Sequence, residues 1–180
     1  MKFLIYGNAP TAGTGEPKGL RAAGSVRVTT GGSLITPTYD KLVDVVYSIA
    51  DAYRTTGTAG WLMGDSTAGT LRKLRDGAGG TIGAVLWEPS LTNGLVNGQP
   101  DRLLGYPVYT DPNVASLASN ARIAAFGDFS SYYLRTVGNV AIDSSTERYF
   151  DTDQTAFRGK WRVDGDLIDT GAITVLQQAV

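Results

Sequence analysis

One segment of the chain carries apolar residues at the spacing of a helix. Four of them recur at intervals of four, three and four residues: Leu42, Val46, Ile49 and Tyr53. Charged and polar residues occupy the opposite side of this pattern, Thr38 precedes it as an N-cap, and residues 55–57 supply a stop that ends in glycine. We therefore expect one amphipathic helix that begins at residue 39 and continues to about residue 54.

Two shorter elements follow this helix. Residues 60–63 form a brief apolar run that predicts a buried strand, and we expect Trp61 and Leu62 to lie beneath the first helix. Asp65 or Ser66 then caps a second helix. This helix buries two leucines and exposes three basic residues: Leu71 and Leu74, then Arg72, Lys73 and Arg75. A solvated helix face is the simplest interpretation of these cations, and a phosphate site or a contact with a partner subunit is the alternative.

From residue 103 onward the pattern changes to that of β-strands. Segments rich in β-branched and aromatic residues are separated by Gly, Asp, Asn and Pro: 103–109, 122–126, 132–137, 140–142, 155–163 and 172–176. Asp128 after Gly127 predicts a capped turn, and Asp164 before Gly165 predicts a hairpin turn. Helices in the first half and strands in the second indicate an α+β fold.

One of the predicted strands has two chemically different faces. Its apolar residues alternate with three cations: Phe157, Trp161 and Val163 against Arg158, Lys160 and Arg162. Because alternate residues of a strand face opposite ways, one face is apolar and the other is basic. We favour a ladder with acidic residues of an adjacent strand or a neighbouring subunit over a contact with nucleic acid.

The composition removes much catalytic chemistry. The 180 residues include no cysteine and no histidine, which excludes disulfides, thiolate nucleophiles and zinc–thiolate sites and removes the usual general base. Sixteen basic residues nearly balance 17 acidic ones, so no overall field attracts nucleic acid. No apolar run approaches the roughly 20 residues that cross a bilayer. Glycine, with 23 residues, is in excess and indicates frequent turns.

Paired carboxylates are the remaining candidates for chemistry. Asp151 with Asp153, and Asp164 with Asp166, are spaced to face one way on a strand, where a pair could bind a divalent cation or perform acid–base catalysis. Turn chemistry explains both pairs more simply. The serines lack a histidine base and a nucleophile-elbow motif. We therefore expect no enzyme activity, no cofactor and no metal site.

Short motifs follow one another along nearly the whole chain. Their defining residues are Gly7, Pro17, Gly19, Trp61, Gly105, Pro107, Gly127, Asp128, Asp164 and Gly165. The same motifs occur in this order and with similar spacing in the major capsid proteins of tailed phages. The chain resembles that family, whose members have the Hong Kong 97 fold.

The resemblance implies a structural subunit of an icosahedral phage or prophage head. It places an axial domain at residues 37–143, the returning β part of the peripheral domain at residues 144–180, and the end of the front half of the peripheral domain at residues 1–36. In the family, the N-terminal arm, the extended loop and most of the spine helix precede the matching stretch. The expected architecture is therefore an α+β capsid fold without those three parts.

The resemblance also implies the partners. Copies of the chain would form pentamers and hexamers, with other capsid, portal or decoration proteins as further partners, packaged DNA bound without specificity, and no membrane. The protein would be part of the virion after assembly in the host cytoplasm. Candidates for the subunit contacts are Arg72, Lys73, Arg75, Tyr106, Tyr132, Arg158, Lys160 and Arg162.

Two further expectations concern function. Some family members join their subunits through an isopeptide bond that needs an asparagine on a peripheral strand, and no asparagine follows Asn139 in this chain. We therefore expect no self-crosslinking. The alternative function is a β-rich binding module of a phage particle, of the tail or adhesin type, that builds no shell.

Overall fold

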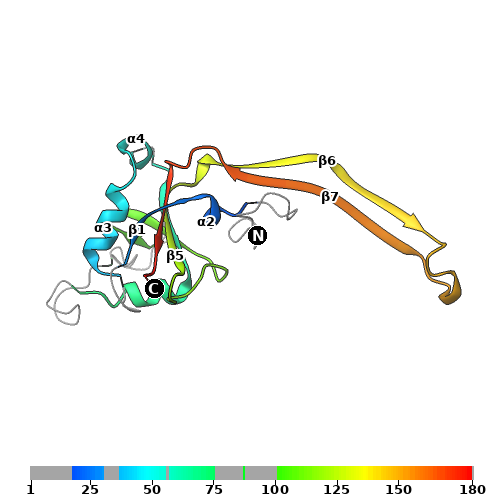
Figure 1. Cartoon of the computed structure of the whole chain (residues 1–180), viewed down its shortest axis with the longest axis horizontal. Helices are drawn as coiled ribbons and strands as arrows, with labels where there is room; N and C mark the ends of the chain where they lie inside the picture. The colour runs from blue at the N-terminus through cyan, green and yellow to red at the C-terminus, as the bar shows by residue number, and fades with distance from the viewer. Residues whose placement is uncertain (1–17, 31–36, 56, 76–86, 88–100, 180) are drawn as a thin grey trace, which may run out of the picture.

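A mixed six-stranded sheet forms the body of the molecule, and a long two-stranded hairpin projects from it (Figure 1). This computed structural model describes residues 18–30, 37–55, 57–75, 87 and 101–179. The elements follow in this order: α2 (Leu20–Ala23), β1 (Ser25–Thr29), α3 (Tyr39–Tyr47), α4 (Asp51–Arg54), β2 (Ala59–Met63), α5 (Asp65–Leu71), β3 (Arg102–Leu103), β4 (Tyr106–Thr110), β5 (Arg122–Asp128), η3 (Phe129–Ser131), β6 (Tyr132–Ser145), η4 (Phe150–Thr152), β7 (Ala156–Leu167) and β8 (Ile173–Gln177).

The strands of the body lie in the order β1-β8-β5-β2-β4-β3. β5 is antiparallel to both of its neighbours, β2 and β8. β1 runs parallel to β8, β4 runs parallel to β2, and β3 is antiparallel to β4 at one edge. Within the described ranges, no helix has the length and apolar character needed to cross a bilayer.

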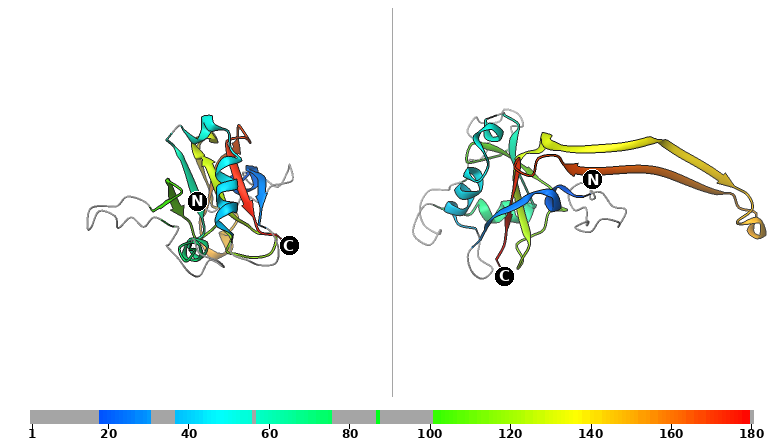
Figure 2. Two further views of the ribbon diagram at one scale, coloured as in Figure 1. Left: turned by 90° about the vertical axis from the view of Figure 1, so that its left-hand side faces the viewer. Right: turned by 45° about the horizontal axis from the view of Figure 1, so that its top comes forward.

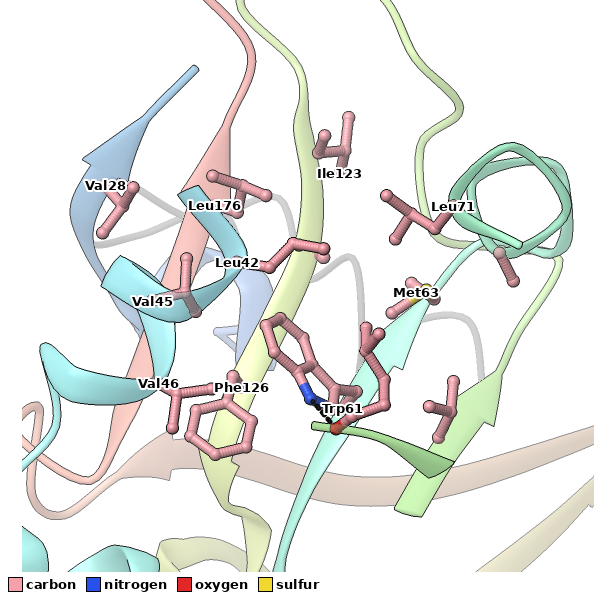
Figure 3. Packing of buried hydrophobic residues seen from close by; sticks show 14 of the residues in the cluster. Val28, Leu42, Val45, Val46, Trp61, Met63, Leu71, Ile123, Phe126 and Leu176 are labelled. Atoms are coloured by element: carbon pink, nitrogen blue, oxygen red, sulfur yellow. Dashed lines mark hydrogen bonds between the residues drawn. The ribbon is translucent and has the colours of Figure 1, made fainter. Parts of the chain in front are cut away.

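The core lies between α3 and one face of the sheet. α3 contributes three buried side chains to the cluster that also contains Trp61 and Phe126 (Figure 3): Leu42, Val45 and Val46. Trp61 is 0% exposed, and its ring centroid lies 4.8 Å from that of Phe126. Its Nε1 donates a hydrogen bond of 3.1 Å to the carbonyl oxygen of Leu103. The prediction that Trp61 is buried beneath the first helix is confirmed.

Leu62 occupies the opposite face of the sheet, because successive side chains of a strand alternate. It is half-buried and packs against a second apolar cluster that includes Ala125 and Val175. The expectation that Leu62 shares the environment of Trp61 is therefore wrong.

The first helix is shorter than predicted. α3 begins after Thr38, which occupies the predicted N-cap position without a side-chain cap hydrogen bond. It ends at Tyr47, and the short helix α4 follows separately. The Ser48 hydroxyl donates to the carbonyl oxygen of Val45 over 2.7 Å and lies 2.9 Å from Thr174 Oγ1. This alternative bonding, together with an extended residue 50 (ψ 145°), interrupts the helix.

The second helix begins and ends earlier than predicted. Gly64, rather than Asp65 or Ser66, is the N-cap residue of α5, and a Cβ at this position would lie 2.9 Å from the carbonyl oxygen of Val114. The helix ends at Leu71. The basic run at residues 72–75 consequently lies in the turn after the helix and not on a helix face.

The segment predicted as one strand at 103–109 is a tight hairpin. Leu104 and Gly105 have φ values of 53° and 81°, and positive φ at both central residues is typical of a two-residue hairpin turn. Pro107 pairs with Arg102 on the short edge strand β3. The motif residue Gly105 therefore lies in the turn, and Pro107 lies in β4 beside the edge strand.

The projecting hairpin is formed by β6 and β7. Their pairing runs from Tyr132 opposite Leu167 to Ser145 opposite Ala156, with one irregularity between Val137 and Ala141. The two strands predicted at 132–137 and 140–142 are thus a single strand. Residues 164–165 lie inside β7 and not at a turn, so that turn prediction is wrong. Figure 2 shows the hairpin extending well beyond the body.

The sheet body and the hairpin do not follow the expected domain boundaries. The body takes β1 from the lead-in and β8 from the C-terminal segment, while the hairpin spans residues 132–167. The expected boundary between residues 143 and 144 falls inside β6. The sequence reasoning missed α2 and β1, although Val26 and Val28 alternate with polar residues in the manner of a strand.

Candidate functional site

The base of the hairpin brings together residues that are far apart in the sequence. The backbone N–H of Lys18 donates to the carbonyl oxygen of Gly165 over 3.1 Å, and Tyr132 Oη donates to the carbonyl oxygen of Lys18 over 2.8 Å. Lys18 Nζ lies 3.2 Å from a carboxylate oxygen of Asp166. A Cβ at position 165 would lie 2.3 Å from Tyr132 Oη, so a larger residue there would displace the Tyr132 ring. These bonds fix the direction in which the hairpin leaves the body.

The corner between β5 and the hairpin is held by Gly127 and Asp128. Gly127 has a φ of 148°, and a Cβ there would lie 2.1 Å from the carbonyl oxygen of Ala172. The Asp128 carboxylate accepts hydrogen bonds from the backbone N–H of Ser130 (2.9 Å) and the hydroxyl of Thr58 (3.0 Å). Burial raises the pKa of Asp128, but the hydrogen bonds from Ser130 and Thr58 outweigh it and hold that pKa below its usual value. The predicted cap of residues 129–131 is confirmed.

One face of the hairpin is apolar and exposed. Its large side chains are between 51% and 74% exposed: Leu134, Ile142, Phe157 and Trp161. The register places all four on the same side, opposite the cations of β7. We call this set the apolar face. A contiguous exposed patch of this kind is typical of a surface that another polypeptide segment covers.

The other face carries the predicted basic residues. Asp143 lies directly opposite Arg158, 3.4 Å from its guanidinium and 2.6 Å from Lys160 Nζ. Hydrogen bonds from Lys160 and Arg158 lower the pKa of Asp143. This pairing agrees with the predicted ladder between the cations and an acidic residue of an adjacent strand. Arg162 lies opposite Val137 and forms no ion pair with any residue that the structure describes.

The remaining interface candidates lie in the body or at the base of the hairpin. Arg72 pairs with Asp101 and stacks over the ring of Trp87, and Lys73 and Arg75 are exposed nearby. Tyr106 packs edge-on against the ring of Phe126 in the core, and Tyr132 contacts Lys18. The structure therefore joins Arg158 and Lys160 through Asp143 but does not bring the run at 72–75 to the hairpin.

Two motif residues, Gly7 and Pro17, lie outside the described residues, whereas Gly19 is the buried residue that precedes α2. Asp166 pairs with Lys18, which accounts for one member of the carboxylate pair at 164 and 166. Among the described residues, no cluster of three or more Asp or Glu side chains is arranged to hold a metal ion. Lys18 and Asp143 were missed as site residues, because only the folded structure shows which charges meet.

Comparison with known proteins decides the family. A model of the phage capsid family matches residues 5–178. The chain belongs to the phage capsid family. The predicted family and its α+β capsid fold are thereby confirmed. No curated protein matches the chain.

Solved capsid structures share this fold. The capsid of a native GTA particle matches with a TM-score of 0.74 and 28% identity, and the capsid of an empty GTA particle with 0.72 and 29%; each match covers 99% of this chain. Gordonia phage Cozz matches with a TM-score of 0.58 and 16% identity over 98% of this chain, which shows the fold alone. The chain spans 60% of the length of the GTA capsid chains and 57% of the Cozz chain.

Proposed function

We propose that this chain builds the head of a phage or prophage as a structural subunit that assembles with copies of itself into pentamers and hexamers around the DNA genome. The observation that carries the proposal is the projecting hairpin. An isolated chain leaves the apolar face in water, and burying apolar surface is the main favourable term in protein association. Membership of the phage capsid family supports an assembly of copies as the place where this surface is buried.

The sheet body and the hairpin are separate parts of the structure, which supports assigning them to different domains. We assign the sheet body to the axial domain and the hairpin to the peripheral domain, with boundaries at the two ends of the hairpin. We assign the apolar face to contacts with neighbouring copies. The basic face, with Arg158, Lys160 and Arg162, then remains available for contacts between subunits.

The remaining partners follow from the same proposal. Portal and decoration proteins would contact the assembled head, DNA would be enclosed without sequence recognition, and assembly would take place in the host cytoplasm before the protein is found in the virion. The role is structural, and we propose no catalytic activity. A binding module that builds no shell has no observation in its favour, since the family match extends over residues 5–178.

Native mass spectrometry of the chain at rising concentration tests the proposal. We expect discrete rings of five or six copies, or larger shells, at multiples of the 19.0 kDa chain mass. A species that stays monomeric at every concentration would contradict a shell-forming role.

A further inference from the structure

One edge of β7 has no partner strand among the described residues, because the hairpin is a sheet of only two strands. At the base of the hairpin a single backbone hydrogen bond reaches this edge, from the N–H of Lys18 to the carbonyl oxygen of Gly165 over 3.1 Å. The N–H and C=O groups of one strand residue point to the same side, and residues two apart share that direction. The N–H groups of Gly165 and Leu167 therefore also point outward from β7.

Two aspartates bind these outward N–H groups. Asp164 Oδ1 accepts a hydrogen bond from the N–H of Gly165, and Asp166 Oδ1 accepts one from the N–H of Leu167, each over 2.8 Å. Each carboxylate thus caps the residue that directly follows it. Aspartate side chains that bond to nearby backbone groups compete with the ladders of regular secondary structure. The donors on both sides of the Gly165 carbonyl are consequently not available to a neighbouring strand.

The segment before β1 runs in the direction that a parallel ladder with β7 requires. It continues into β1, β7 is followed by β8, and β1 and β8 are parallel. In such a ladder the carbonyl oxygen of Lys18 would accept from the N–H of Leu167. Instead it accepts from Tyr132 Oη over 2.8 Å, while Asp166 takes the N–H of Leu167 and lies 3.2 Å from Lys18 Nζ. Side chains therefore occupy both partners of the next ladder bond, and pairing stops after one.

We propose that Asp164 and Asp166 are edge caps, which occupy the outward N–H groups of β7 and prevent strand pairing from spreading along the hairpin. An exposed strand edge is a template for pairing with other chains, and charged side chains near the edge are one means by which proteins block it. Protection matters here because Phe157 and Trp161 of the same strand are 74% and 63% exposed. The inference does not depend on the proposed function, since the capping bonds form within one chain.

A divalent cation is the competing explanation for this pair of carboxylates. The ammonium group of Lys18 lies 3.2 Å from Asp166 and repels a cation at that oxygen. Among the residues that the structure describes, no third acidic side chain joins the pair to form a metal-binding group. Both Oδ1 atoms already accept backbone hydrogen bonds. These observations favour capping over metal binding.

Amide hydrogen exchange of the unassembled wild type, followed by NMR, tests whether the caps form in solution. Val163 lies two residues before Gly165 on the same edge, and no side chain of the described residues caps its N–H. After correction for the intrinsic rate of each residue, we expect the amides of Gly165 and Leu167 to exchange at least about tenfold more slowly than that of Val163. Equal corrected rates at the three positions would show that the carboxylates are not caps.

A pair of matched double variants tests the consequence for aggregation. Asp164→Val with Asp166→Val removes both caps, whereas Asp40→Val with Asp151→Val makes the same chemical change at two exposed positions outside the hairpin strands. Thioflavin T fluorescence detects cross-β aggregates and does not depend on the assembly of folded copies. We expect the first variant to shorten the lag time at least about threefold relative to the second, because only the first exposes the strand edge. Equal lag times would overturn the proposal.

Two further measurements complete the test. If the double variant does not fold, Asp164→Val alone keeps the ion pair between Lys18 and Asp166 and should still shorten the lag time relative to Asp40→Val. Calorimetric titration of the wild type with calcium chloride should give no saturable heat. Saturable binding that Asp164→Val abolishes would assign the pair to a cation and overturn the capping role.

Discussion

Replacing Trp61 with alanine removes the largest fully buried side chain of the core. The indole is 0% exposed, lies 4.8 Å from the ring of Phe126 and donates its N–H to the carbonyl oxygen of Leu103. The substitution deletes an apolar group, leaves a cavity between α3 and the sheet, and removes a hydrogen-bond donor from a buried carbonyl oxygen.

The magnitude follows from these three losses. Truncation of a buried tryptophan to alanine costs about 3–5 kcal/mol, and the lost hydrogen bond adds about 1 kcal/mol. For a domain of this length each kcal/mol lowers Tm by roughly 2–4 °C, so we expect Tm to fall by roughly 10–20 °C. Trp61→Phe keeps an aromatic ring and loses the N–H donor, and it should cost about 1–3 kcal/mol.

Urea unfolding followed by far-UV circular dichroism measures both variants without relying on tryptophan fluorescence. Trp161→Ala is the matched control, because Trp161 is 63% exposed on the apolar face and its replacement should change the free energy of unfolding by about 0.5 kcal/mol or less. Equal effects at Trp61 and Trp161 would refute the assignment of the core. If Trp61→Ala does not fold, Trp61→Phe still distinguishes the buried position from the exposed one.

The remaining predictions concern the corner at Gly127, the dependence of stability on pH, and covalent crosslinking. Gly127→Ala should destabilise the chain by roughly 3 kcal/mol or more, since its Cβ would overlap the carbonyl oxygen of Ala172. The control Gly138→Ala, at φ 72° with no atom within 4 Å of the added Cβ, should cost only about 1–2 kcal/mol. Equal thermal shifts for the two variants would contradict this. Because the folded pKa of Asp128 is lowered, its ionised form contributes stability that is present above the unfolded pKa of about 3.9 and is lost as pH falls through the folded pKa. The difference in unfolding free energy between the wild type and Asp128→Asn should therefore be constant from about pH 6 to 8 and shrink below about pH 4; a constant difference down to about pH 2 would show that the charge is not involved. Purified protein should give no covalent ladder on a denaturing gel after long incubation, and high-mass bands that survive boiling in detergent would disprove this.

The elements that could be predicted from sequence are those whose pattern is local. The start of α3, the burial of Trp61 and the cap at Asp128 each depend on residues a few positions apart. The break after Tyr47 could not be read in this way, because Ile49 and Tyr53 continue the helical spacing while Ser48 bonds to Thr174, 126 residues away.

The hairpin shows the same limit more clearly. Asp164 and Gly165 have the local signature of a turn, yet they are held in β7 by pairing with Arg135 and Leu134 and by the backbone of Lys18. The alternation of Arg158 and Lys160 with apolar residues did predict two distinct faces. Their partner Asp143 is fixed only by a register that shifts between Val137 and Ala141, which no local pattern encodes.

Negative-stain electron microscopy of the concentrated chain tests most directly the claim that copies of it build a shell. We predict rings or closed shells for the wild type, and fewer particles for Arg158→Glu with Lys160→Glu, whose far-UV circular dichroism should match that of the wild type. Isolated chains alone at every concentration would contradict the account. It would also be contradicted if the charge reversal left the number of particles unchanged but abolished their retention of DNA.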